Sequence, residues 1–159
     1  MSEILFAGLT YEQVVKKYAQ TVTGVCIMRL KNYNDAEDCF QNTFIKLYAN
    51  SSEFSDETHL KAWLIRVAIN ECGDYLRKNR RHLPLDEAKL LEEGFDEDRY
   101  DISWALFKTP QKYREVLYLY YIEQYKVSEI AEILQIKESA VKARLKRGRE
   151  KLKIIYGGD

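Results

Sequence analysis

The sequence predicts an all-α fold of two small helical domains joined by an acidic linker. Apolar residues recur at the three- and four-residue spacing of helices along nearly the whole chain. Only two prolines and seven glycines occur among the 159 residues, a composition that favours helices over a sandwich or barrel. Proline disfavours helix in the residue before it, so Leu83–Pro84 ends the first half. We therefore expect a first domain over residues 1–83, a linker over 84–103 and a second domain over 104–159.

Three helices are expected in the first domain. The first spans about Thr10–Lys31, and the second begins at Asp35, where acidic residues in the first turn favour the helix dipole. The third spans about His59–Asn79, after a polar loop over 50–58. Their apolar, inward-facing positions are Val14, Val15, Tyr18, Val22, Val25 and Cys26, then Ala36, Cys39, Phe40, Thr43, Phe44 and Leu47, then Leu60, Leu64, Val67, Ala68, Cys72 and Leu76.

The second domain is expected to end in a helix-turn-helix. Helical periodicity resumes near Trp104, and Thr109–Pro110 is typical of a helix start, with threonine as the N-cap and proline in the first turn. Two further helices follow over about Val127–Leu134 and Glu138–Ile154, joined by a short turn at Gln135–Lys137. This spacing is that of a helix-turn-helix, whose second helix enters the DNA major groove.

Charge is strongly segregated, although the chain is neutral overall. Residues 137–153 carry eight basic side chains against two acidic ones, a net +6, whereas residues 86–101 carry eight acidic against two basic, a net −6. Arg77, Lys78, Arg80 and Arg81 form a further basic cluster. A strongly basic second helix suits the phosphate-lined major groove. The alternative is a solvated basic face on a terminal helix.

Several classes of function are disfavoured. The apolar stretches are short and broken by charge, so no membrane insertion is expected, and the first ten residues do not resemble a secretory signal. Cys26, Cys39 and Cys72 lack metal-ligand spacing and are expected to be buried, reduced thiols of a cytoplasmic protein. His59 and His82 are far apart and have no accompanying nucleophile. We predict no enzyme activity, no metal and no cofactor.

The C-terminal segments resemble a known DNA-binding domain. Tyr113–Leu117, Val127–Leu134 and Val141–Arg149 are together similar to the promoter −35-reading domain of bacterial sigma factors, most of all the compact extracytoplasmic-function (ECF) type. That family usually has glycine where this chain has Gln135, and serine where it has Lys137. A non-glycine residue in a left-handed turn costs about 1 kcal/mol, so we expect a looser or differently shaped turn.

The N-terminal segments resemble the other half of the same family. Asp35–Phe44 is similar to the segment that docks on the polymerase clamp, and its Asp35, Asp38 and Asn42 share one helix face with Gln41 beside them. Leu60–Asn70 and Tyr75–Arg81 are similar to the helix that reads the −10 element and its basic end. Trp63, Arg66, Asn70 and Arg77 form a stripe suited to single-stranded DNA, because bases stack on rings and phosphates meet guanidinium groups.

The resemblance implies a sigma factor that binds core RNA polymerase and directs promoter-specific initiation on DNA that is partly double-stranded and partly melted. The implied polymerase-binding residues are Asp35, Asp38, Gln41 and Asn42. The implied −10-reading residues are Phe54, Lys61, Trp63, Arg66, Asn70, Arg77 and Arg80. The implied −35-reading residues are Lys142 and Arg147 at base edges, Ala143 at a thymine methyl, and Arg144, Lys146 and Arg149 at phosphates.

Rival readings remain open at the level of sequence. The strongest is a stand-alone helix-turn-helix regulator that binds its operator without polymerase; a related one is an inactive sigma-like adaptor. Trp63 could be a plain core tryptophan, and the acidic face of the second helix could be merely solvated. The tyrosines at 118, 120, 121 and 125 could pack in the core or contact an anti-sigma protein, whose existence the sequence does not decide.

Overall fold

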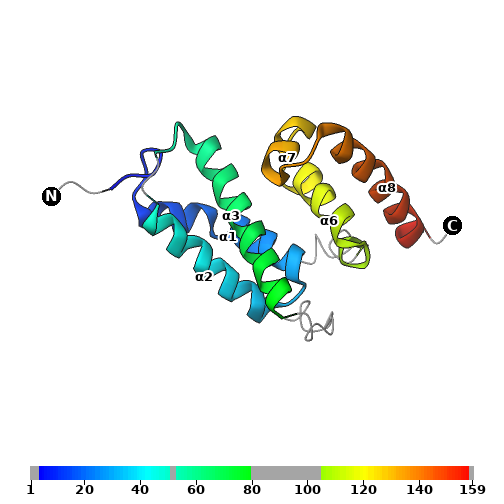
Figure 1. Cartoon of the computed structure of the whole chain (residues 1–159), viewed down its shortest axis with the longest axis horizontal. Helices are drawn as coiled ribbons and strands as arrows, with labels where there is room; N and C mark the ends of the chain where they lie inside the picture. The colour runs from blue at the N-terminus through cyan, green and yellow to red at the C-terminus, as the bar shows by residue number, and fades with distance from the viewer. Residues whose placement is uncertain (1–3, 51–52, 80–104, 158–159) are drawn as a thin grey trace. The chain divides into compact units, whose positions relative to one another are not determined.

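The computed structural model describes residues 4–50, 53–79 and 105–157 (Figure 1). Contacts divide the chain into two compact units, Met1–Leu85 and Asp86–Asp159. The described residues are helical apart from turns and one isolated bridge between Phe6 and Leu9, so the predicted all-α class is confirmed. The predicted acidic linker lies outside the described residues.

The first unit is a bundle of α1 (Tyr11–Leu30), α2 (Tyr33–Ala49) and α3 (Glu57–Lys78), each packed on the other two. Local side chains fix where the helices begin. Thr10 and Gln13 form a capping box at α1, and the side chains of Asn32 and Asp56 accept the N–H groups of Asp35 and His59 at α2 and α3. The second and third helices therefore begin two residues earlier than the sequence predicted.

The core of this unit is the apolar stripe of each helix turned inward. Burying such side chains contributes roughly 1.5–3 kcal/mol each for valine, leucine or isoleucine. Fully buried members are Val14, Val22, Val25, Leu47, Leu60, Leu64 and Ile65. Four residues that were expected to be buried are only half-buried: Val15, Phe40, Val67 and Leu76.

The second unit contains α6 (Gln111–Leu117), the π-helix η2 (Tyr118–Ile122), α7 (Val127–Leu134) and α8 (Glu138–Gly157). Leu117 in α6, Ile130 in α7 and Leu145 in α8 are buried, and α8 packs on both α6 and α7. The wide turn of η2 was not predicted: Glu123 donates its N–H to the carbonyl of Tyr118, five residues back, at 3.1 Å.

The start of α6 corrects one expectation. Thr109 was predicted to be the N-cap with Pro110 in the first turn. The N-cap is instead Pro110, and the Thr109 hydroxyl donates to the carbonyl of Ala105 at 2.8 Å. Residues 105–108 are themselves helical, so the hydroxyl of Thr109 satisfies a carbonyl of the preceding helix rather than an amide of the next one.

Within the described ranges, no helix is both long enough and apolar enough to cross a membrane.

Candidate functional site

The outer face of α2 carries three of the four predicted polymerase-binding residues. Asp38, Gln41 and Asn42 are exposed. Asp35 is half-buried, and its Oδ1 accepts a hydrogen bond from the hydroxyl of Tyr75 in α3 at 2.5 Å. That bond, more than burial, raises the pKa of Tyr75 to about 12. Asp35 thus joins two helices of the bundle, whereas the other three present their polar groups to solvent.

Two apolar side chains on α2 extend this outer face and were missed by the sequence analysis. Ile45 is 60% exposed and Tyr48 is 72% exposed. Seven residues place Ile45 within about 20° of Asp38 around the helix, whereas ten place Tyr48 about 80° away. There the ring of Tyr48 meets that of Tyr11, with centroids 5.3 Å apart. The signal was available, because both fall outside the inward stripe of α2. Exposed apolar groups beside carboxylates and amides are typical of a protein-binding surface.

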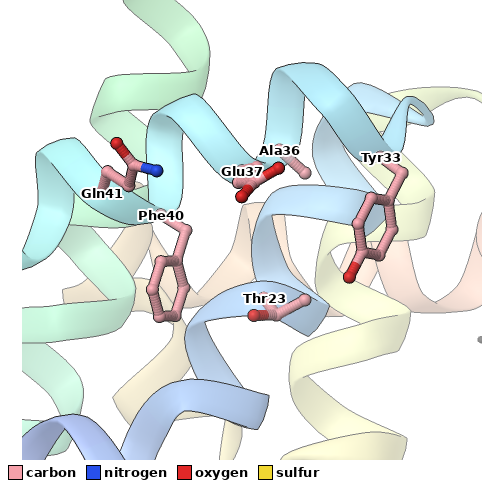
Figure 2. Close-up of a pocket in the computed structure, with 6 residues that line it drawn as sticks. All are labelled: Thr23, Tyr33, Ala36, Glu37, Phe40 and Gln41. Atoms are coloured by element: carbon pink, nitrogen blue, oxygen red, sulfur yellow. The ribbon is translucent and has the colours of Figure 1, made fainter.

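A hollow of about 200 Å³ lies beside this face, between α1 and α2 (Figure 2). Figure 2 shows Tyr33 and Phe40 projecting from α2 on the side of Thr23 in α1, with Glu37 and Gln41 at the rim. This explains why Phe40 is half-buried: its ring lines the hollow instead of entering the core. The hollow combines two rings with one carboxylate.

The start of α3 brings three aromatic rings together. The ring of Phe54 meets those of His59 and Trp63 edge-on, with centroids 5.2 Å and 5.5 Å away. Trp63 is half-buried, so part of its ring remains accessible. The Nδ1 atom of His59 accepts the backbone N–H of Ser55 at 3.1 Å, which orders the loop that carries Phe54. The cluster offers an accessible aromatic edge at the end of a helix.

Two of the three acidic residues in this stretch, Asp56 and Glu57, are engaged by protein groups, and the third, Glu53, is exposed. Asp56 caps α3 through the N–H of His59. Glu57 accepts hydrogen bonds from the ammonium of Lys17 and the hydroxyl of Tyr18, both in α1. The Lys17 bond, and then the Tyr18 bond, lower the pKa of Glu57, while burial and Glu57 raise the pKa of Tyr18 to about 12. Neither carboxylate is therefore a free negative charge beside the aromatic cluster.

Farther along α3, Arg66, Asn70 and Arg77 are exposed, and Lys61 is half-buried. They continue the stripe that starts at Trp63. Arg77 is paired with Asp74, an acidic neighbour that the sequence analysis did not weigh. Arg80, the last predicted member, lies outside the described residues.

Helices α7 and α8 form a helix-turn-helix with a left-handed turn residue. Gln135 has φ 56° and ψ 47°, which is the left-handed conformation. Ile136 donates its N–H to the carbonyl of Ala131 at 3.0 Å, which closes the turn. Val141 and Leu145 are buried on the inner side of α8. The turn is therefore formed despite its non-glycine residue.

The outer side of α8 displays most of the predicted duplex-reading residues. Lys142, Ala143, Lys146 and Arg147 are exposed, and Arg144 is half-buried. A hydrogen bond with Arg147 is the main cause that lowers the pKa of Tyr113, so this arginine also contacts α6. Arg149 is exposed, but its Nε donates to the Tyr121 hydroxyl at 2.6 Å. Its guanidinium is thus engaged by η2.

The sequence left open whether four tyrosines of the second unit pack in the core or lie at the surface for a protein contact, and the structure shows both situations. Tyr125 is buried, Tyr118 and Tyr120 are half-buried, and Tyr121 is 50% exposed.

The three cysteines are buried in the first unit. Hydrogen bonds among their thiols raise the pKa of Cys39 and of Cys72, so these groups are poor nucleophiles.

Comparison with known proteins places both units in one family. Residues 14–82 match the family model for sigma-70 region 2, and residues 110–152 match that for sigma-70 region 4. The chain is 32% identical to the ECF RNA polymerase sigma factor SigW of Bacillus subtilis, over 90% of this chain and 87% of that protein. The chain belongs to the ECF sigma factors. It is also 27% identical to the ECF sigma factor SigM of the same organism, over 93% of this chain and 96% of that one.

Two solved structures share the fold. The sigma factor RpoE of Bartonella quintana, crystallised with the anti-sigma factor NepR, matches with a TM-score of 0.73 and 24% identity, over 94% of this chain and 98% of that one. CnrH, in complex with the cytosolic domain of CnrY, matches with a TM-score of 0.69 and 25% identity, over 94% of this chain and 88% of that one. As an ECF sigma factor, the protein acts in promoter-specific initiation of transcription by RNA polymerase.

Proposed function

We propose that the first unit docks on core RNA polymerase and grips the melted −10 element, while the second unit reads the −35 element as duplex. The observation that carries this proposal is the separation of two chemistries. An aromatic ring cluster and exposed cations follow one another along α3, and a basic outer face lies on the second helix of a helix-turn-helix. The first suits single strands, and the second suits the major groove.

Docking is assigned to the outer face of α2. Asp38, Gln41 and Asn42 offer one carboxylate and two amides to a basic partner surface, and Ile45 and Tyr48 add apolar area that a partner would remove from water. Asp35 stabilises the position of this face, because its carboxylate accepts a hydrogen bond from Tyr75 in α3.

Reading of the −10 element is assigned to the exposed side of α3 and the loop before it. The accessible part of the Phe54–Trp63 cluster can stack an unpaired base, a contact worth about 1–3 kcal/mol per base. Asn70 can read a base edge, and Lys61, Arg66, Arg77 and Arg80 can meet the backbone. The carboxylates of Asp56 and Glu57, at this end of α3, are both engaged by protein groups.

Reading of the −35 element is assigned to α8. Lys142 and Arg147 are placed at base edges and Ala143 at a thymine methyl, with Arg144 and Lys146 at phosphates. Arg149 was expected at a phosphate as well. Its guanidinium is engaged by the Tyr121 hydroxyl and by the rings of both Tyr120 and Tyr121, more contacts than Arg77 or Arg147 has, so we leave it out of the proposed contact set.

Polymerase is required for energetic reasons. Opening the duplex costs about 1.4 kcal/mol per stacked step, and extruding one base costs a few kcal/mol more. A small helical unit cannot supply this alone. Docked on a large enzyme, two weak modules act at high effective concentration, so their affinities combine. The protein accordingly acts in the cytoplasm, where polymerase and promoter DNA are found.

A protein partner that restrains this chain is part of the proposal. Two structures of the same fold contain a partner: the sigma factor RpoE is in complex with the anti-sigma factor NepR, and CnrH is in complex with the cytosolic domain of CnrY. The exposed apolar groups Ile45 and Tyr48 would suit such a partner in the absence of polymerase.

Run-off transcription with purified core polymerase tests the proposal. We expect initiation from genomic promoter fragments with core and this chain together, and none with core alone. A gel shift on the same fragments separates the rivals: a stand-alone regulator would bind its site tightly without core. Failure to associate with core, or to give promoter-dependent transcripts, would contradict the proposal.

A further inference from the structure

Two consecutive residues near the middle of α8 make close contacts with α6 and η2. The first is Gly148, which is buried against α6. A Cβ at this position would lie 2.9 Å from Cδ1 and 3.1 Å from Cγ of Leu117, and 3.3 Å from Cβ of Tyr113. The α8 backbone therefore approaches α6 more closely than a residue with a side chain allows.

The second residue is Arg149, whose side chain is held by two tyrosines of η2. Its Nε donates to the Tyr121 hydroxyl at 2.6 Å. The guanidinium carbon also lies 5.6 Å and 5.7 Å from the ring centroids of Tyr120 and Tyr121. A planar guanidinium that both stacks and donates has little rotational freedom left. The side chain thus links α8 to η2 at one defined place.

The π-helical form of η2 accompanies this arrangement. Two neighbouring residues, Tyr120 and Tyr121, both reach the same guanidinium, with their rings edge-on and their centroids 4.9 Å apart. Neighbouring side chains of a regular α-helix point about 100° apart. A local π turn is the usual kind of distortion found where a helix serves a specific contact.

The contact between Arg149 and η2 matters because the turn before α8 has no glycine, so the direction of α8 depends more on contacts along the helix itself. Gln135 takes a left-handed conformation that costs about 1 kcal/mol for a residue with a Cβ. We propose that Arg149, held by Tyr120 and Tyr121, is a positioning residue that fixes the aim of α8, and that it does not contact a DNA phosphate. This inference rests on the proposed role of α8 in reading the −35 element.

The two roles of Arg149 predict different salt dependence. A phosphate contact releases counterions, so its loss lowers the slope of log affinity against log salt by about 0.9. A positioning residue leaves that slope unchanged and instead lowers the preference for the correct sequence. The measurement uses holoenzyme assembled from core polymerase and the full chain. Its affinity is compared for a promoter duplex and a matched duplex with a scrambled −35 element, at several salt concentrations.

We expect Arg149→Gln to lower the preference for the intact −35 element by about ten-fold, the loss of roughly one base contact, with the slope on scrambled duplex unchanged. Tyr121→Phe, which removes the hydroxyl alone, should act in the same direction. The double variant should be no worse than Arg149→Gln. Lys146→Gln, at a proposed phosphate contact, is the matched control and should lower the slope.

A lowered slope for Arg149→Gln, or an unaltered preference in Tyr121→Phe, would overturn the inference. The inference would also be overturned if Tyr121→Phe lowered the preference for the intact −35 element equally in the unsubstituted chain and in Arg149→Gln. The tyrosine would then act independently of the arginine. Tyr121→Phe keeps the ring, so it carries the test if Arg149→Gln lacks a normal circular dichroism spectrum. If unsubstituted holoenzyme shows no preference for the intact element, the proposed role of α8 fails first, and that result is distinct.

Discussion

At the scale of single residues, the carboxylates near the aromatic cluster show how the fold handles unwanted charge. An acidic loop beside a proposed DNA surface would repel phosphates if its charges were free. Asp56 is instead the N-cap of α3, and Glu57 is held by Lys17 and Tyr18. The same two residues that look unfavourable for DNA therefore stabilise the helix on which the aromatic cluster is built.

Glu57 gives a pH-dependent prediction. Its pKa is lowered below the ordinary 4.5 in the folded chain, so its contribution to stability is present above that value and is lost as pH falls through the lower, folded pKa. Glu57→Gln should therefore lower the melting temperature at neutral pH, and the difference from the unsubstituted protein should shrink in acid below pH 4.5.

Thermal unfolding followed by circular dichroism measures this difference. Glu53→Gln, at an exposed position of the same loop, is the control and should melt like the unsubstituted protein at both pH values. A Glu57→Gln difference that stays constant or grows in acid would show that the carboxylate does not act through its charge.

Gly148 gives a prediction about close packing. Alanine is favoured over glycine inside a helix by about 1 kcal/mol. Overpacking against Leu117 and Tyr113 costs about 1–3 kcal/mol, so we expect Gly148→Ala to lower the free energy of unfolding rather than raise it. Urea unfolding measures this change. Ala143→Gly, at an exposed position of α8, isolates the propensity effect and should cost about 1 kcal/mol. A more stable Gly148→Ala would refute the close contact.

At the scale of helices, the sequence predicted the features that depend on residues close together in the chain, namely the positions and bounds of the helices. Apolar spacing placed α7 at its observed bounds and α1 within a residue or two, because periodicity and capping are local properties. The left-handed conformation of Gln135 was expected as well, although from the resemblance to sigma factors and not from local spacing. The errors at Phe40 and Thr109 arose because a half-buried ring and a backward hydrogen bond depend on what lies opposite.

Contacts across the bundle could not be predicted in this way. Tyr75 meets Asp35 across 40 residues, Arg149 meets Tyr121 across 28, and Glu57 meets Lys17 across 40. Each depends on the angle at which two helices cross, and a single sequence does not determine that angle. The candidate residues were therefore predicted as faces of helices, while the groups that hold or occupy them emerged from the structure.

The turn of the helix-turn-helix yields a prediction at this scale. Glycine at position 135 would relieve the left-handed strain, so Gln135→Gly should raise the free energy of unfolding by up to about 1 kcal/mol. Glu132→Gly, at an exposed position within α7, is the control and should lower it by a similar amount. Urea unfolding measures both, and a loss of stability in Gln135→Gly would mean that the glutamine side chain supports the turn.

The outer face of α2 yields a second prediction at the scale of helices. Ile45→Lys should leave the melting temperature nearly unchanged, because the side chain is 60% exposed, yet weaken binding to core polymerase by about ten-fold or more if it is an interface anchor. Ile4→Lys, at an exposed position outside the helices, is the control and should bind normally. Binding is measured by fluorescence anisotropy of labelled chain titrated with core, and equal affinity for both variants would remove Ile45 from the docking surface.

At the scale of the whole molecule, the overall neutral charge conceals two units that carry differently charged faces. The first pairs an acidic, amide-bearing face on α2 with a cationic and aromatic side of α3, and the second presents a basic face on α8. Neither unit needs strong affinity by itself, because both would be held on the same enzyme beside the same promoter. Polymerase docking, strand capture and duplex reading are accordingly assigned to three separate helices.

Strand capture by the first unit is tested most directly with 2-aminopurine, a fluorescent base that brightens when unstacked, placed in the −10 element of a duplex promoter. We expect fluorescence to rise when core polymerase and this chain are added together, but not with either alone. Trp63→Ala should abolish most of the rise while the −35 element still supports binding. A rise produced by the chain without core, or an undiminished rise with Trp63→Ala, would contradict this account.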